Sequence, residues 1–353
     1  MSSRKWVKIW GFITMFALIS VGVFNYLMDP LWLFSHKFSF NNIQSSFSER
    51  QQKTNLIHFR NVSSHDGVLV GSSRSTFINQ NDFTGMRIFN YAVDSMNTFE
   101  YKGYIDFFKN NIKNLDYIII GADFYNTNTP KNITAELPKY YIENTQAPLY
   151  RLKTLISSDA LNYSIRNIKN YFRDSKDNKY NRDNVRYRNK ASEEDRLRAY
   201  TKNIKRHTSY FVGQEYKYNP QYLSILNAVK NDNPDAKIII FTSPISADLL
   251  VSIIKNGKRL EEYRKWLNDL VDIFGSVYHF MDINSITTNL DNYPDDDHYY
   301  PWIGTFVANR VSGKTNDNIP DDFGILLNKC NLDDYLSEFE KEVRLYKNPL
   351  PIR

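Results

Sequence analysis

The sequence predicts an α/β fold in which a parallel sheet is covered by helices. Three short apolar runs, each bounded by turn residues, read GVLVGSS at 67–73, DYIIIGADF at 116–124 and AKIIIFTSP at 236–244. Continuous runs of Ile, Val and Leu suit strands that are buried on both faces, as in parallel sheets. Segments of helical length separate these runs, so strand and helix alternate along the chain.

The first element along the chain is an apolar segment typical of a membrane anchor. Arg4, Lys5 and Lys8 precede twenty residues without a charge, IWGFITMFALISVGVFNYLM, which are enough to cross the hydrocarbon of a bilayer. The alternative, a cleaved signal peptide, has a shorter apolar core and small residues at its cleavage site, which NYLMDPLW lacks. The basic residues lie before the span, so the positive-inside rule predicts a cytoplasmic N-terminus and an extracytoplasmic remainder.

The remaining elements follow in an order that divides the chain into five parts. We expect a cytoplasmic tip and anchor at 1–28, a juxtamembrane segment leading into a helix at 29–64, the α/β domain at 65–130 and 216–316, a largely helical insertion at 131–215, and a helical tail at 317–353. Further strands are predicted at 87–93 and 277–283. The helices of the domain are predicted in NTFEYKGYIDFFKNNIKN, in PQYLSILNAVKNDNP and from about residue 302, and LDDYLSEFEKEVRLYK in the tail has the pattern of one amphipathic helix.

The insertion is the basic part of the chain. Residues 151–210 hold sixteen Lys and Arg against seven Asp and Glu, interleaved with Tyr171, Tyr180, Tyr187 and Tyr200. Such a stretch could bind nucleic acid, but outside a membrane anionic lipid headgroups or a charged surface glycan are the expected partners. The interpretation we favour needs no partner: a solvated helical insertion with a basic face.

Polar side chains follow the predicted strands at the ends where ligands bind to open parallel sheets. They are Ser72 and Ser73 after the first strand, Asn90 to Ser95 after the second, Asp123 and Asn126 after the third, and Asp295 and His298 after the last. A serine becomes a nucleophile when a histidine takes its proton and a carboxylate holds that histidine in the right tautomer. The alternatives are a plain strand-to-helix turn after Gly71 and a Ca²⁺ site in the acidic run Asp295 to Asp297.

These motifs together resemble the SGNH or GDSL hydrolase superfamily, in which the nucleophile follows an early strand as Gly-Asp-Ser and a late Asp-x-x-His completes the triad. Gly71-Ser72-Ser73 takes the place of the first motif, and Asp295-Asp296-Asp297-His298 takes that of the second. The resemblance implies a flavodoxin-like sheet with Ser73 as nucleophile, His298 as base and Asp295 as its orienting carboxylate, without a cofactor or metal. With the span, Asp29-Pro30 and Gly-Ser-Ser, the chain looks most similar to the membrane-anchored branch associated with alginate-type polysaccharide O-acetylation and teichoic-acid D-alanylation.

The chain departs from this family at the oxyanion hole, which usually combines the serine N–H, a glycine N–H and an asparagine side chain. Ser95 stands where the glycine is common, and Asp123 stands where the asparagine is expected. Ser95 can still offer its N–H, whereas an ionised Asp123 would repel an oxyanion, so we expect it to be protonated, turned away or structural. Arg74 is a candidate replacement donor or substrate clamp, with a surface arginine as the alternative, and Asn90 is a further candidate for the oxyanion or substrate site.

The resemblance implies an O-acyltransferase of the bacterial cell envelope, anchored by one span in the cytoplasmic membrane. Ser73 would accept an acyl group, expected to be acetyl, from a multi-pass membrane acyltransferase and pass it to a hydroxyl of a surface or secreted polysaccharide. The same residues would serve an esterase with water as acceptor. A third hypothesis is a non-catalytic glycan-binding subunit of an acyltransferase complex. Nucleic acid is not an expected partner.

Overall fold

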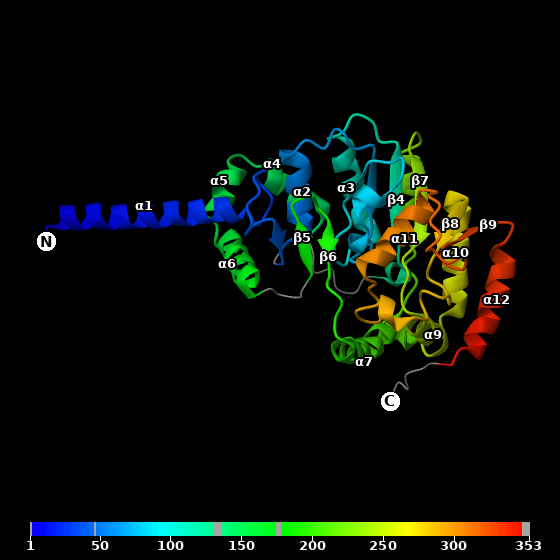
Figure 1. Cartoon of the computed structure of the whole chain (residues 1–353). Helices are drawn as coiled ribbons and strands as arrows, with labels where there is room; N and C mark the ends of the chain where they lie inside the picture. The colour runs from blue at the N-terminus through cyan, green and yellow to red at the C-terminus, as the bar shows by residue number, and fades with distance from the viewer. Residues whose placement is uncertain (1, 46, 130–135, 174–177, 348–353) are drawn as a thin grey trace. The chain divides into compact units, whose positions relative to one another are not determined.

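The computed structural model describes residues 2–45, 47–129, 136–173 and 178–347 and divides the chain into two compact units. Unit 1 consists of Met1–Val62 and Glu136–Arg188, and unit 2 consists of Ser63–Ala135 and Asn189–Arg353. The segment predicted as one insertion, 131–215, therefore contributes residues to both units. Figure 1 shows the chain coloured from its N-terminus to its C-terminus and labels many of its helices and strands.

Unit 1 is built of helices and a small antiparallel sheet. Its helices are α1 (Ser3–Met28), α2 (Glu49–Phe59), α4 (Pro138–Gln146), α5 (Tyr150–Leu155) and α6 (Ser158–Arg173). In its sheet, β5 (Lys179–Asn181) lies between β1 (Ile43–Gln44) and β6 (Arg186–Tyr187) and is antiparallel to both. The predicted juxtamembrane segment supplies β1 and α2 to this unit.

Helix α1 coincides with the predicted N-terminal apolar segment and is long and apolar enough to cross a membrane. It ends at Met28 because Asp29 adopts a left-handed conformation with a φ of 41°. The Asp29 carboxylate accepts the N–H groups of Leu33 and Phe34 at 2.7 and 3.1 Å and forms a fully buried ion pair with Arg182. The turn that follows α1 is therefore held by a cation from the predicted insertion.

The basic stretch at 151–210 is less exposed than its composition suggests. Three of its arginines are buried, and each is paired with a carboxylate of its own unit: Arg182 with Asp29, Arg186 with Glu49, and Arg196 with Asp291. Tyr180 and Tyr200 are also buried. The favoured interpretation, a solvated basic face, is therefore wrong for these residues, because they neutralise acids or fill the interior.

Unit 2 contains a mixed six-stranded sheet in the order β3-β2-β4-β7-β8-β9. The strands are β2 (Gly67–Val70), β3 (Ile88–Asn90), β4 (Tyr117–Ala122), β7 (Lys237–Thr242), β8 (Ser276–His279) and β9 (Ile325–Asn328). The first five strands in this order are parallel, and β9 pairs antiparallel with β8. The predicted α/β class with a largely parallel sheet is confirmed, and each of the five predicted strand segments overlaps one of the parallel strands.

The antiparallel strand β9 corrects the prediction that the sheet is wholly parallel and the tail at 317–353 wholly helical. The tail forms β9 before its helix, α12 (Leu332–Leu345). Only Leu327 of this four-residue strand is fully buried, and Leu326 is 44% exposed, so the local sequence carries a weak strand pattern. The strand forms because the edge of β8 offers unpaired backbone groups that another segment can bond.

Helices cover both faces of the sheet. On one face, Ile303 and Val307 of α11 (Pro301–Val311) join a core with Leu69, Ile119 and Phe241 of three strands. Because side chains alternate along a strand, the neighbouring strand residues face the other side. There the contacts with the strands are made by α3 (Thr98–Lys109) and α10 (Leu260–Phe274), and α8 (Tyr222–Asn231) packs on both of these helices. The remaining helices of unit 2, α7 (Glu193–Ser209) and α9 (Ala247–Lys255), pack on each other, and α9 also contacts α12.

Candidate active site

The strand order places the candidate residues at the point where the sheet changes direction. From β2 the chain goes to β3 on one side and, through α3, to β4 on the other. The loops after β2 and β4 therefore diverge, which is where open α/β sheets bind ligands. Ser73 follows β2 and Asp123 follows β4, so the predicted polar residues lie at this edge.

The structure brings Ser73, His298 and Asp295 together. The Oγ atom of Ser73 lies 2.9 Å from Nε2 of His298, and Nδ1 of His298 lies 3.1 Å from each carboxylate oxygen of Asp295. Asp295 Oδ1 also accepts a hydrogen bond from the backbone N–H of His298 at 2.8 Å, and this bond holds the carboxylate next to the ring. This is the connectivity that activates a serine for attack on a carbonyl carbon.

Ser73 is the accessible serine of the three in this loop. Ser72 and Ser75 are 1% and 0% exposed, whereas Ser73 is half-buried and the side chain of His298 is 24% exposed. The side chain of Ser75 sits between Gly71 and Gly121, where a Cβ atom on either glycine would collide with it. Ser75 therefore packs the base of the loop, and Ser73 is the hydroxyl that a substrate can reach.

Asp297 is a second carboxylate beside the histidine. The Oδ1 atom of Asp297 lies 2.9 Å from Nδ1 of His298 but accepts no hydrogen bond from the ring. Asp297 therefore acts on His298 through its negative charge. Burial lowers the pKa of His298, but the charges of Asp297 and Asp295 outweigh burial and raise that pKa to about 10. The imidazole is therefore protonated at neutral pH, and it can take the Ser73 proton only after losing its own.

Arg74 is buried, in contrast to the surface arginine considered from the sequence. Its Nη1 donates to Asp123 Oδ1 at 2.8 Å, its Nη2 pairs with Asp297 Oδ2 at 3.1 Å, and its Nε donates to the Asp297 carbonyl at 2.8 Å. Burial lowers the pKa of Arg74, but the charges of Asp123 and Asp297 outweigh it and raise the pKa. Arg74 thus links the loop after β4 to the loop that carries His298.

The structure leaves some of the candidate oxyanion donors available and engages the others in hydrogen bonds or ion pairs. Within the described residues, the backbone N–H groups of Ser73 and Ser95 have no hydrogen-bond acceptor, as donors of an oxyanion hole require. Ser95 has a left-handed φ of 52°, the conformation that favours glycine. The Val93 N–H donates to the Gly71 carbonyl at 3.1 Å, so the loops that carry the two serines run beside each other.

Asp123 and Asn90 do not supply a free donor. Asp123 is 1% exposed and forms an ion pair with Arg74. Of the roles considered for Asp123, the structure therefore supports a structural one. The Asn90 amide donates to the carbonyls of Ser75 and Ile78 at 2.9 and 2.8 Å. Asn90 therefore braces the turn that follows Ser73.

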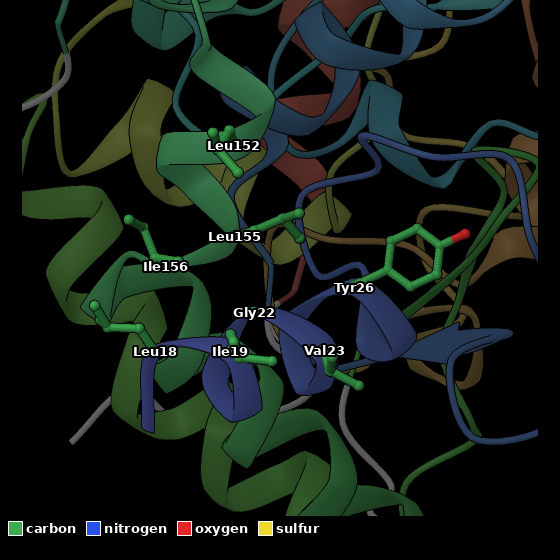
Figure 2. A pocket seen from close by; sticks show the side chains of 8 residues that line it. All are labelled: Leu18, Ile19, Gly22, Val23, Tyr26, Leu152, Leu155 and Ile156. Atoms are coloured by element: carbon green, nitrogen blue, oxygen red, sulfur yellow. The ribbon is translucent and has the colours of Figure 1, made fainter. Parts of the chain in front are cut away.

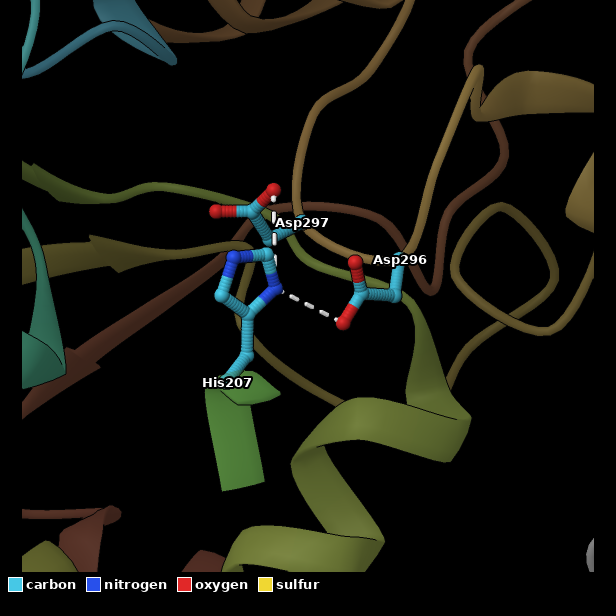
Figure 3. Close-up of side chains that lie close together, drawn as sticks. All are labelled: His207, Asp296 and Asp297. Atoms are coloured by element: carbon cyan, nitrogen blue, oxygen red, sulfur yellow. Dashed lines mark hydrogen bonds and ion pairs between the residues drawn. The ribbon is translucent and has the colours of Figure 1, made fainter. Parts of the chain in front are cut away.

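His207 of α7 is a further polar residue at the site (Figure 3). Its Nδ1 lies 2.8 Å from Asp296 Oδ2 and 3.9 Å from Asp297 Oδ1. Arg206 Nη2 lies 3.1 Å from the other ring nitrogen and can only donate, so the ring hydrogen belongs on Nδ1 and is donated to Asp296. Burial raises the pKa of Asp296, and the hydrogen bond from His207 opposes this rise.

Among the residues that the structure describes, two groups of side chains are close enough to hold a metal ion. They are His207 with Asp296 and Asp297, and His298 with Asp295 and Asp297. One imidazole with two carboxylates suits a transition metal better than Ca²⁺, which takes oxygen ligands throughout. Both groups include Asp297, whose other oxygen is already paired with Arg74. A cation would compete with this guanidinium, so neither group needs a metal ion to explain it.

Sequence reasoning missed the roles of Asp297 and His207. Asp297 stands in the Asp-Asp-Asp-His run, but the run does not say which carboxylate turns toward the ring. His207 lies in the predicted insertion and has no motif around it. Comparisons with family models, curated proteins and solved structures give no match to this chain, so the site is interpreted from its own geometry.

Proposed function

We propose that this protein is a serine acyltransferase of SGNH type, anchored in the bacterial cytoplasmic membrane with its N-terminus in the cytoplasm. Ser73 Oγ attacks an acyl carbonyl, His298 takes the hydroxyl proton and returns it to the leaving oxygen, and Asp295 orients the ring. The single observation that carries the proposal is the 2.9 Å contact of Ser73 Oγ with His298 Nε2, with Asp295 on the opposite nitrogen. In the second half-reaction a hydroxyl of a polysaccharide displaces Ser73.

The charge of His298 does not separate transfer from hydrolysis in this proposal. The raised pKa of His298 means that the neutral imidazole must form before either a sugar hydroxyl or water can be activated, so the choice between them depends on which acceptor the site binds. An esterase uses the same residues with water as acceptor. The donor, expected to be a multi-pass membrane acyltransferase, and the acetyl group are inferred from the family resemblance alone.

The second candidate is a non-catalytic, glycan-binding subunit. It is favoured by Asp123, whose carboxylate stands where the family has an oxyanion-binding amide and is committed to Arg74. Two backbone donors would then remain, from Ser73 and Ser95. A site that lacks one donor loses roughly 10² to 10³ in rate, which would leave a weak enzyme or none.

The experiment is acylation of the purified chain with 4-nitrophenyl acetate, followed by mass spectrometry of the peptide that contains residues 71–78. We expect an acetyl group on Ser73 and, with a polysaccharide or simple alcohol added, its transfer to the acceptor hydroxyl. Ser72→Ala is the matched control that keeps the reactive hydroxyl, and Ser73→Ala is the variant that should carry no adduct. Acetylation of the Ser73→Ala peptide to the wild-type extent would contradict the proposal.

A further inference from the structure

The freely exposed part of α1 is shorter than the hydrocarbon of a bilayer. Residues 9–20, which follow the last basic residue, Lys8, are exposed and carry no charge. At 1.5 Å per residue these twelve residues span about 18 Å, against a hydrocarbon thickness of about 30 Å. The rest of the bilayer must be crossed by 21–28, a part of α1 that contacts within unit 1 cover on one side, while Val23 and Tyr26 stay exposed.

We propose that α5 is a second membrane-contacting element, whose apolar face lies among the lipid acyl chains of the outer leaflet beside α1. The proposal rests on the anchoring proposed above. Both α5 and α6 contact α1, and they flank the end of α1 that leads into the rest of unit 1 (Figure 1). Whatever surrounds residues 21–28 therefore also surrounds the neighbouring surface of α5.

One exposed side of α5 is apolar. Leu152 of the helix is 57% exposed, and Leu149 and Ile156, the residues that flank the helix, are 68% and 47% exposed. Arg151 and Lys153 are exposed beside Leu152. An apolar hollow separates this face from α1, lined by residues of α1 from Leu18 to Tyr26 and by Leu152, Leu155 and Ile156 (Figure 2). Gly22 adds no side chain to the hollow, and a Cβ atom at this position would lie 3.8 Å from the side chain of Ile156.

Polar groups at this depth are satisfied within the protein, as a hydrocarbon environment requires. The amide of Asn25, inside α1, donates to the Leu155 carbonyl at 2.8 Å and accepts from Ser164 Oγ at 2.8 Å. Ser20 Oγ donates to the Phe16 carbonyl one turn earlier at 2.8 Å. Lys153 borders the apolar face, where its long side chain can reach lipid headgroups.

Continuity with the anchor favours lipid as the occupant of this surface. An amphipathic segment next to a transmembrane helix buries its apolar face in the interface without any partner protein. The alternative occupants are a second copy of the chain and the transmembrane helix of a partner. Either would shield the apolar face from small probe molecules, because protein excludes probes that lipid admits. These occupants are therefore distinguishable outcomes of one measurement.

The test uses the full chain with Cys330→Ser, spin-labelled at a single new cysteine and reconstituted into nanodiscs of phosphatidylcholine and phosphatidylglycerol. The labelled positions are Leu152, Ile13 in the exposed part of α1, and Lys139 of α4, whose side chain is 80% exposed. We expect the labels at Leu152 and Ile13 to collide readily with oxygen and little with the water-soluble nickel complex NiEDDA. The Lys139 label should show the reverse, and thermal unfolding checks that each variant is folded.

Two results at Leu152 would overturn the inference while leaving the anchor intact: access to NiEDDA equal to that at Lys139, which indicates water, or shielding from both probes, which indicates a protein neighbour. Access of NiEDDA to the Ile13 label would instead show that α1 itself is outside the bilayer. In that case the proposed anchoring fails, and the membrane contact of α5 fails with it.

Discussion

The Oδ1 atom of Asp297 lies 2.9 Å from Nδ1 of His298, nearer than either oxygen of Asp295, each of which is 3.1 Å away. Asp295 makes the hydrogen bonds that orient the ring, and Asp297 adds a second negative charge. Arg74 pairs with the other oxygen of Asp297 at 3.1 Å, so this carboxylate connects two cations. The resting site therefore holds a charged imidazole, and its reactivity should follow that charge.

The first prediction concerns the pH dependence of the wild type. Because the pKa of His298 is raised to about 10, the neutral base forms only as pH rises, and kcat/KM for an activated ester should climb well beyond pH 7. The measurement is initial rate against pH from 6 to 10.5, corrected with the Ser73→Ala protein for spontaneous hydrolysis. A plateau reached at or below pH 6.5 would show that the two carboxylates do not hold the proton.

The second prediction separates the two carboxylates. Asp297→Asn removes a charge next to His298 and should shift the acid limb of the kcat/KM profile to lower pH, with higher activity at pH 7. Asp295→Asn also removes a charge but loses the hydrogen bonds that orient the ring, so its maximal rate should fall. Equal pH profiles for Asp297→Asn and the wild type would contradict the assigned role of Asp297.

The third prediction concerns the nucleophile and base. Ser73→Ala and His298→Ala should each lower ester hydrolysis or acyl transfer by roughly 10³-fold or more, and the double variant should be little worse than either. Ser72→Ala should retain most of the activity, since Ser72 is buried. Rates with a soluble ester and thermal unfolding curves distinguish lost chemistry from lost folding. Full activity of purified Ser73→Ala would leave the binding-subunit hypothesis as the better one.

The fourth prediction is a gain of activity in Asp123→Asn. Asp123 Oδ1 accepts from Arg74, and its Oδ2 has no hydrogen-bond donor in the described part of the chain. An asparagine oxygen can keep the Arg74 bond while the amide nitrogen takes the place of Oδ2 and offers a donor. The rate should rise by up to roughly 10²-fold, while the free energy of unfolding falls by about 1–3 kcal/mol.

The control for this change is Asp123→Ala, which breaks the same ion pair without adding a donor. It should be destabilised at least as much and show no gain in rate. If both variants lose activity in parallel, the carboxylate serves only to hold Arg74 and lies away from the oxyanion position.

The fifth prediction concerns Lys53 of α2, which is 1% exposed. Burial lowers its pKa to about 7, with Glu49 opposing and Arg186 adding to the shift. Between about pH 7 and the ordinary lysine pKa of about 10.4, the unfolded chain binds the extra proton, so the contribution of Lys53 to stability rises with pH. Lys53→Met should therefore raise the melting temperature most at pH 7 or below.

The difference in melting temperature between Lys53→Met and the wild type should shrink steadily as pH increases from 7 to 10. Glu49 keeps the Tyr180 hydroxyl at 2.7 Å and Arg186 at 3.3 Å in the variant, so its own charge stays paired. Thermal unfolding of both proteins at matched pH gives the difference directly. A difference that is independent of pH would show that Lys53 keeps its ordinary pKa in the fold.

The local sequence determined the strands that carry their own signal. The runs that became β2, β4 and β7 are short, continuous and rich in Ile and Val, and the uncharged twenty residues before Asp29 became α1. β9 could not be predicted in the same way, because its four residues form a strand only where the edge of β8 is available. Backbone pairing with a distant strand overrode the weak local pattern there.

In the candidate site, too, some features could be predicted from the local sequence and others depend on the tertiary structure. Ser73, Asp295 and His298 could be proposed from the sequence because each lies directly after a predicted strand or within a short motif, and chain order alone brings such ends to one edge of a sheet. The burial of Arg74, its bridge between Asp123 and Asp297, and the contact of His207 with Asp296 were decided by tertiary structure. Arg74 and Asp297 are 223 positions apart, and their pairing follows from packing that no local pattern records. The residue types therefore determined which chemistry is available, and the fold determined the charge of the histidine that would perform it, because burial and neighbouring carboxylates set that pKa.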